Sequence, residues 1–387
     1  SIKGALRFWW RALMWGKASS IADLRQKEAE LFGNSGKEGQ SKVVIRLELH
    51  NPPSAIPVGA LLSRDGSRSV KEPNPVVEDG ARYLGYGLME AFSGKNTVAG
   101  RLTRSCLPAP FEFSLHIHFK SAIDPEQEKE FVEALKLFGL CGSLGSRSRR
   151  GFGSVSLTSL IDNGTEIWAA PANASEWEAA FRNICKAFPE KGGLPKWTSL
   201  AKGESKILLL PAASTSPLQH LAQIGRDFVF FRSAGRWNSQ KNRREVFGQS
   251  AEPNFLDDHD LMAAVINSRS TPTTHPARIA FGLPQNYFFS STDNKGSVTP
   301  AEYDRRASSL IFHIHQAAPT NPPLGVLIFL PSQFLPSGED GISVNGKTVP
   351  LAHNGTGAFW QPVHAFLERL QKGSGKEKFH SARLVEL

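Results

Sequence analysis

The sequence predicts an α+β protein made of two domains. The chain has 387 residues, which is more than one average domain needs. Hydrophobic residues make up 40% of it and charged residues 21%, as is typical of a globular protein and not of a disordered or coiled-coil chain. Short segments with the apolar pattern of strands alternate with capped segments that have the pattern of helices, and this order occurs twice.

Residues 1–17 have the pattern of an amphipathic helix. An apolar stripe occupies one face, and Lys3, Arg7 and Arg11 recur at every fourth position on another. Like charges at this spacing repel one another. We therefore expect an anion to bind along them, with Trp10 beside them as a surface on which a base can stack. The alternative is a core helix whose arginines extend into water.

The rest of the N-terminal half contains helices with typical N-caps and strands of alternating pattern. In chain order we expect a helix over 20–32, a strand over 42–50, a long loop over 51–80, a short helix over 81–92, a strand over 111–119, a helix over 124–138 and a strand over 155–161. The main elements correspond to a ferredoxin-like (RRM-like) βαββαβ domain that lacks its first strand. We therefore expect residues before Ser1 to be missing from the sequence.

A glycine-rich loop over residues 139–154 has the composition of a phosphate-binding loop. Its glycines let the backbone take positive φ and let another chain approach closely, its serines can donate to phosphate oxygens, and its arginines supply the counter-charge. The residues expected to make these contacts are Gly145, Ser146, Arg147, Ser148, Arg149, Arg150, Gly151, Phe152 and Gly153. The loop matches neither GxxxxGK[ST] nor a dinucleotide fingerprint, so no nucleotide or other cofactor is expected. The alternative is a solvated surface hairpin.

The C-terminal half repeats the βαββαβ order after a connecting segment. The segment covers 162–204 and includes a short helix near 174–188. We then expect strands over 206–210, 278–283, 310–315, 326–330 and 379–387, and helices over 216–231 and 359–370. The sequence thus predicts tandem ferredoxin-like domains with long inserted loops, over 1–161 and 205–387.

The charge balance favours an acidic partner. Lys and Arg number 45 against 36 Asp and Glu, which gives a net charge of +9 and a pI near 9.5. Further cations surround Trp237 in a stretch without acids, residues 232–244, and this mixture of basic and aromatic residues suits single-stranded RNA. Another pair of arginines begins a strand and is also expected to contact RNA. These cations are Arg236, Lys241, Arg243, Arg244, Arg305 and Arg306. The alternatives are a solvated loop and an arginine paired with Asp304.

The residue types that carry metal binding or catalysis do not complete a known pattern. Cys106, Cys141 and Cys185 form no paired-cysteine motif, so we expect no zinc module, no disulfide framework and a reducing, cytoplasmic location. His313 and His315 share one face of a strand and could act as general bases or bind a metal. No carboxylate–histidine signature accompanies them, so we expect neither a metal site nor a catalytic centre.

Two motifs together resemble the RAMP superfamily of CRISPR proteins, most closely subunits of the type III-B effector, the Cmr complex. They are IKGALRFWWRAL at 2–13 and GSLGSRSRRGFGSV at 142–155. The segments 281–284 and 304–310 also resemble the family, although this chain has Ser309 at a position where members of the family usually have proline. The resemblance implies ferredoxin-like domains and a non-catalytic RNA-binding subunit at the end of the complex where the 3′ portion of the guide meets its target. Guide RNA, target RNA and other RAMP subunits would then be its partners, without a membrane.

Three other interpretations compete with this one. Residues 150–157 nearly match the RNA-recognition-motif signature R-G-F-G-F-V-x-F, but Ser154 and Leu157 replace the aromatic residues that stack bases, so that interpretation is disfavoured. A metal-independent ribonuclease that processes guide RNA would use His313 as a base. A membrane-surface protein would rest on the helix over 1–17 alone.

In the favoured interpretation the glycine-rich loop, the N-terminal helix and the basic loops form one track for RNA phosphates. Base pairing with the guide then carries the sequence specificity. The loops over 51–80 and 232–258 are long for a compact monomer, so we expect them to dock on neighbouring subunits.

Overall fold

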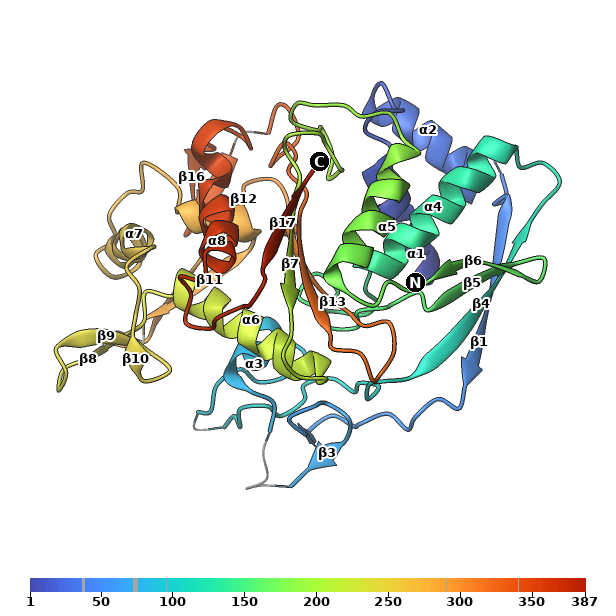
Figure 1. The fold of residues 1–387 in the computed structure, drawn as a ribbon. Helices are drawn as coiled ribbons and strands as arrows, with labels where there is room; N and C mark the ends of the chain where they lie inside the picture. Colours follow the sequence, from blue (N-terminus) through green and yellow to red (C-terminus); the bar gives the residue numbers. More distant parts are fainter. Residues whose placement is uncertain (37–38, 72–75, 95, 290, 340) are drawn as a thin grey trace.

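The computed structural model describes residues 1–36, 39–71, 76–94, 96–289, 291–339 and 341–387. They form a mixed α/β fold with eight α-helices and several small antiparallel sheets (Figure 1). The predicted α+β class is confirmed at this level.

The helices begin largely where the sequence places N-caps. They are α1 (Ile2–Leu13), α2 (Ile21–Phe32), α3 (Asp79–Leu84), α4 (Pro125–Cys141), α5 (Ala174–Lys186), α6 (Pro217–Arg232), α7 (Leu256–Asn267) and α8 (Gln361–Gln371). Side chains of Ser1, Ser20, Asp124, Asn173 and Ser216 accept hydrogen bonds from backbone N–H groups in the first turns of α1, α2, α4, α5 and α6. These caps made the helix starts predictable.

The strands are short and pair antiparallel throughout. They are β1 (Val43–His50), β2 (Leu61–Leu62), β3 (Ser69–Val70), β4 (Glu112–Phe119), β5 (Ser159–Asp162), β6 (Thr165–Ala169), β7 (Lys206–Pro211), β8 (Arg236–Asn238), β9 (Arg243–Val246), β10 (Gln249–Ser250), β11 (Gln285–Phe289), β12 (Asn294–Pro300), β13 (Leu310–His315), β14 (Leu324–Phe329), β15 (Gly341–Val344), β16 (Lys347–Pro350) and β17 (Arg383–Glu386).

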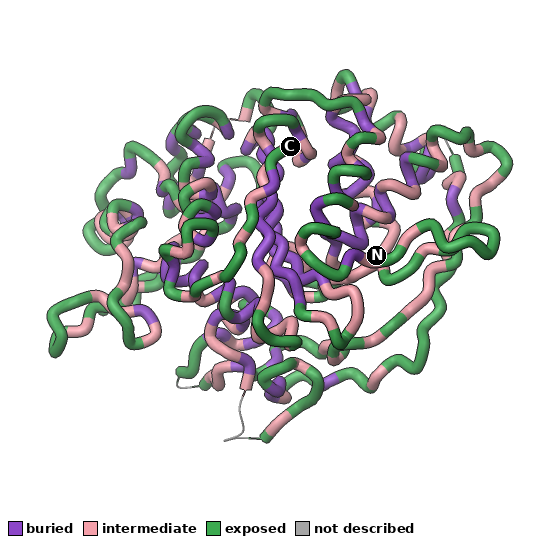
Figure 2. Tube along the Cα trace, in the orientation of Figure 1, coloured by how far each residue is buried: buried purple, intermediate pink, exposed green. Residues whose placement is uncertain are grey.

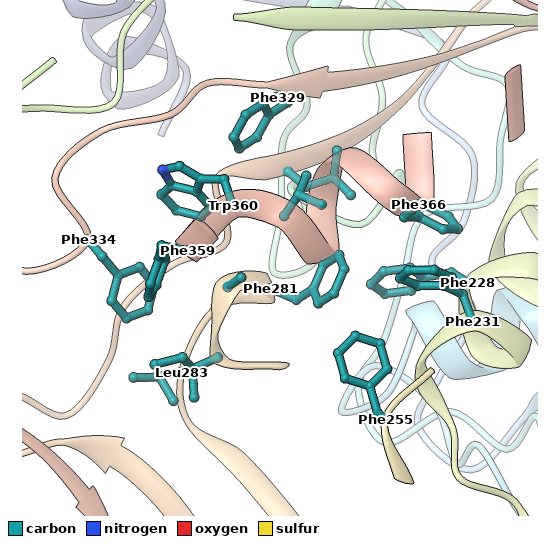
Figure 3. Close-up of a cluster of buried hydrophobic side chains, with 14 of the residues drawn as sticks. Phe228, Phe231, Phe255, Phe281, Leu283, Phe329, Phe334, Phe359, Trp360 and Phe366 are labelled. Carbon is teal, nitrogen blue, oxygen red and sulfur yellow. The ribbon is translucent and has the colours of Figure 1, made fainter. Parts of the chain in front are cut away.

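A four-stranded sheet in the order β13-β14-β7-β17 forms the centre of the molecule. Along the chain its elements follow as β7–α6–β13–β14–α8–β17, the βαββαβ order predicted for this half. Helices α6 and α8 cover one face, where aromatic side chains such as Phe228, Phe281 and Phe366 pack together (Figure 3). Residues of α1, α4 and α5 cover the other face. Burial on both faces explains why β7, β13 and β14 are continuous apolar runs, and they form the buried centre in Figure 2.

The two predicted halves therefore share this sheet. Successive residues of β7 alternate between its faces: Leu208 and Leu210 join the core with α6 and α8, whereas Ile207 and Leu209 join the core with α1 and α4. The helices of the N-terminal half thus bury their apolar faces partly against strands of the C-terminal half. The domain boundaries at 161 and 205 remain a prediction.

Two predicted strands are wrong in position. β1 and β4 pair as expected, with Val43 opposite Phe119. The strand predicted over 155–161 does not join them: residues 155–158 are not in a strand, and β5 pairs with β6 as a separate hairpin. The segment 278–283 contains a 3-10 helix, Ala277–Phe281, and strand β11 starts after it. Because the described N-terminal sheet has only β1 and β4, a tandem of ferredoxin-like domains is not confirmed.

The segment between β1 and β4 packs on its own chain. Ile56, Leu62 and Val77 are at most 5% exposed, in a cluster that includes Ala222 of α6. Part of the loop that we expected to dock on a neighbouring subunit therefore docks on α6; residues 72–75 lie outside the described part, and whether the outer side contacts a neighbour stays a prediction.

Helix α3 holds this segment against α6 at a close contact. A Cβ atom at Gly80 would lie 1.9 Å from the carbonyl oxygen of Ala222, and one at Gly225 would lie 2.3 Å from that of Gly80. We therefore expect Gly80→Ala to lower the free energy of unfolding by roughly 1–3 kcal/mol, the cost of overpacking a close contact. Chemical denaturation measures this loss. Gly192→Ala is the control, because the nearest atom to its Cβ would be 3.6 Å away; equal stability of the two variants would contradict this role of Gly80.

Candidate nucleic-acid interface

The glycine-rich loop closes the outer edge of the central sheet at β13. The N–H of Phe312 donates to the carbonyl oxygen of Arg149 over 3.1 Å. The next two outward N–H groups donate to serine hydroxyls, Ile314 to Ser154 Oγ over 3.0 Å and Gln316 to Ser156 Oγ over 3.1 Å. An open edge would leave these donors unpaired. Ser154 and Ser156 thus fix the end of the loop and the residues after it on the sheet.

The glycines give the loop its folded-back shape. The N–H of Leu144 donates to Gly153 O over 2.8 Å, and a Cβ at Gly153 would lie 1.9 Å from Leu144 O. A Cβ at Gly151 would lie 2.5 Å from Leu221 of α6. The close approach that was expected from another chain is therefore made by this chain at both positions. At Gly145 no atom lies within 4 Å, so the surface is open there.

Arg149 and Arg150 point into the protein. Arg149 Nη1 donates to the carbonyl oxygen of Ser308 over 2.6 Å, and its guanidinium lies 4.8 Å from the ring of Phe8 in α1. Arg150 Nη2 donates to the carbonyl oxygen of Phe281 over 3.2 Å. Burial lowers the pKa of Arg149 to about 10 and that of Arg150 to about 9. Each donates to a protein carbonyl, and Nη1 of Arg150 is buried without a partner among the described residues, so neither guanidinium is presented to a phosphate in solvent.

Arg306 is held in the same way. Its Nε donates to the carbonyl oxygen of Phe334 over 2.5 Å and its Nη2 to Ser332 Oγ over 2.8 Å. Burial lowers its pKa to about 10. The backbones of Arg306 and Leu283 also exchange hydrogen bonds of 3.2 and 2.7 Å. The other three segments that carry the family resemblance, which include Phe8, Phe281 and Ser308, therefore meet around the glycine-rich loop.

Three arginines in or beside the loop have no side-chain partner among the described residues. Arg104 and Arg305 each lie near Arg147 of the loop. Burial, and after it the charges of these two arginines, lowers the pKa of Arg147. None of the three side chains has a hydrogen bond or ion pair to a described residue, and Arg104 and Arg305 are exposed. Tyr86, which is 59% exposed, lies beside Arg147. We call Arg104, Arg147 and Arg305 the arginine cluster.

Comparison with known proteins supports the resemblance of the N-terminal part. Residues 1–156 match the model of the RAMP superfamily. Over this part the chain is similar to that superfamily. Two solved structures resemble the chain. Cmr1 from Pyrococcus furiosus is 18% identical, with a TM-score of 0.49 over 94% of this chain and 88% of that one. A chain of the type III-B Cmr-beta complex bound to cognate target RNA and AMPPnP is 14% identical, with a TM-score of 0.41 over 95% and 91%. No curated protein matches the chain.

The cationic face of α1 has its anion within the protein. Arg11 Nη1 lies 2.9 Å from Glu28 Oε2, and Arg7 Nη2 donates to Gly33 O over 2.6 Å. Lys3 has no partner among the described residues; burial and then the charges of Arg7 and Lys120 lower its pKa. The expected anion site on Arg7 and Arg11 is therefore filled by Glu28. α1 still touches the glycine-rich loop, through Phe8 under Arg149.

The prediction that Trp10 offers a surface for a base is wrong. Its side chain is 1% exposed, and its Nε1 donates to Glu130 Oε2 over 3.3 Å. A ring buried in this way cannot stack a base, because it belongs to the core between α1 and α4. In the sequence, Trp10 directly follows Trp9 of the apolar stripe, but the buried acceptor for its N–H could not be identified from the sequence.

The basic arm formed by β8, β9 and β10 projects from the body (Figure 1). Lys241 Nζ and Arg243 Nη2 lie 3.0 and 2.8 Å from Glu245 Oε1, and hydrogen bonds from Asn238, Lys241 and Arg243 lower the pKa of Glu245 to about 2. Arg244 Nη1 donates to Gly235 O over 3.2 Å. Only Arg236 among the four predicted cations has no side-chain partner in the described structure. The acid-free stretch that we defined ended one residue before Glu245.

The histidines of the ribonuclease alternative are enclosed in the core. His313 is 0% exposed, and burial lowers its pKa well below the ordinary value. His315 is 2% exposed, and its Nε2 lies 2.9 Å from the carbonyl oxygen of Pro171, to which it donates. Neither imidazole can reach a substrate in solvent.

Among the described helices none is long and apolar enough to cross a bilayer.

The different roles of Arg147 and Arg149 can be separated by substitution. Arg149→Ala removes a hydrogen bond to Ser308 O and a contact with Phe8, so we expect the free energy of unfolding to fall by roughly 1–3 kcal/mol. Arg147→Ala removes an unpaired cation, so stability should stay within about 0.5 kcal/mol of the wild type. Urea unfolding of both variants measures this. A larger loss in Arg147→Ala than in Arg149→Ala would contradict the assignment.

Proposed function

We propose that this chain is an RNA-binding subunit of a type III-B CRISPR effector, the Cmr complex, and that it holds RNA through phosphate contacts independent of sequence. The arginine cluster is the observation that carries the proposal. Three unpaired guanidinium groups from distant parts of the chain meet where no described carboxylate neutralises them. Such a group of like charges is unfavourable until an anion joins it.

The chemistry of the cluster suits phosphate. A guanidinium offers a planar fork of donors that matches two oxygens of one phosphate. Gly145 leaves the adjacent backbone open, and Ser146 and Ser148 lie in the same loop. The net charge of +9 attracts a polyanion over a longer range. Contacts of this kind position a nucleic acid without reading its bases.

The motif resemblance supports a place in the type III-B complex. In this proposal the chain is a cytoplasmic, non-catalytic subunit that contacts guide RNA, target RNA and other RAMP subunits. It lies where the 3′ portion of the guide meets the target, and base pairing supplies the specificity. The N-terminal half would be a ferredoxin-like domain with β1 and β4 as its described strands, joined through residues 162–204 to the second domain at 205–387.

The test is RNA binding as a function of salt. Replacing Arg104, Arg147 and Arg305 together with alanine should weaken binding of unrelated single-stranded RNAs to a similar degree. The slope of log affinity against log salt should fall by about 0.7 for each phosphate that the variant no longer neutralises. Fluorescence anisotropy at several salt concentrations gives both quantities.

A matched control is available on the basic arm. Arg243→Ala removes one exposed cation that is already paired with Glu245, so it should change the slope little. An unchanged slope in the triple variant, with its fold intact, would show that the cluster is only solvated surface charge.

A further inference from the structure

Tyr86 adds an aromatic ring to the arginine cluster, and this residue was not among the sites found in the sequence. It is 59% exposed. Isolated apolar side chains on a surface need no explanation. Tyr86, however, lies beside the unpaired cations of the arginine cluster. Two other exposed aromatic residues have local partners, since Tyr303 donates to Glu339 and Phe288 lies 5.7 Å from the ammonium group of Lys295.

A rigid turn presents the ring. The N–H groups of Leu88 and Met89 both donate to the carbonyl oxygen of Gly85, over 2.8 and 3.0 Å. The N–H of Thr103 donates to Leu88 O over 2.9 Å. This hydrogen bond joins the turn to the segment of Thr103, and Arg104 is the next residue of that segment. Tyr86 and Arg104 are therefore held on the same piece of structure.

The glycine-rich loop packs directly on this turn. A Cβ at Gly87 would lie 2.8 Å from Arg147 Nη2, so the guanidinium lies directly against this turn. Gly87 also has φ of +84°, which suits glycine. A Cβ at Gly85 would lie 3.0 Å from Cζ of Phe152. Arg147 and Phe152 of the loop thus contact both neighbours of Tyr86.

We propose that Tyr86 stacks one unpaired base of single-stranded RNA whose phosphates are held by Arg104, Arg147 and Arg305. This inference rests on the proposed function and narrows it to a nucleotide subsite. A cation cluster alone would accept any polyanion, whereas an exposed ring adds an interaction that only a base can make. Bases within a duplex stack on one another and are not free to stack on a protein ring. The subsite therefore selects single-stranded over paired RNA.

The experiment uses the whole chain and three probes: a single-stranded oligoribonucleotide, the same strand annealed to its complement, and inorganic polyphosphate. Tyr86→Ala should weaken binding of the single strand by roughly 10-fold, the size of loss typical of one stacked base. Binding of the duplex and of polyphosphate should not change, and the salt slope should stay as in the wild type. Tyr86→Phe should retain the affinity, because it keeps the ring. Phe288→Ala is the control, since it removes an exposed ring elsewhere.

Two results would overturn the proposal. Full binding of the single strand by Tyr86→Ala would leave the ring without a role. An equal loss on polyphosphate would mean that Tyr86 only supports the arginines. Both results differ from failure of the proposed function, in which the triple arginine variant would bind all three probes like the wild type.

Discussion

The closure of the β13 edge by the glycine-rich loop is the constraint on which the rest of the structure depends. Three consecutive outward N–H groups of this strand find acceptors on the loop, two of them serine hydroxyls. The loop can follow the strand only because Gly151 and Gly153 take positive φ at places where a side chain would collide with Leu221 and Leu144. One segment thereby protects a sheet edge, joins the N-terminal helices to the central sheet and places its arginines at fixed depths.

The depth of each arginine decides what it can do. Arg149, Arg150 and Arg306 donate to backbone carbonyl oxygens, and burial depresses their pKa values to about 10, about 9 and about 10. Below about pH 9 these buried charges therefore lower the free energy of unfolding. This destabilisation disappears only as the pH rises from about 9 towards the ordinary arginine pKa, because the folded protein then loses the protons first. Arg147 lies in the same loop but reaches the surface. An anion at the surface would also lower the cost of the buried charges.

The sequence predicted local features well because local physics determines them. Ser20, Asp124 and Ser216 cap the expected helices, and the apolar runs at 206–210 and 310–315 form buried strands. It could not predict that Arg149 and Arg150 point inward, because their carbonyl partners, Ser308 and Phe281, are more than a hundred residues away in the chain. The counter-charge of Arg11 is likewise on another helix, at Glu28. Arg104 and Tyr86 were missed because no local pattern distinguishes them from other loop residues.

The arginines of the cluster are attached to a rigid backbone, which suits them to bind an anion. Arg147 lies against Gly87, the turn around Tyr86 is tied by hydrogen bonds to the segment of Arg104, and the backbone of Arg306, next to Arg305, is bonded to Leu283. Each cation therefore starts from a backbone that is already fixed, so less conformational entropy is lost when an anion binds. In the proposed function, these fixed charges would bind the phosphates that every RNA carries, and the ring of Tyr86 would stack a base of any identity. Such a site would add binding strength without discriminating between sequences, as suits a subunit of a complex in which a guide strand reads the sequence.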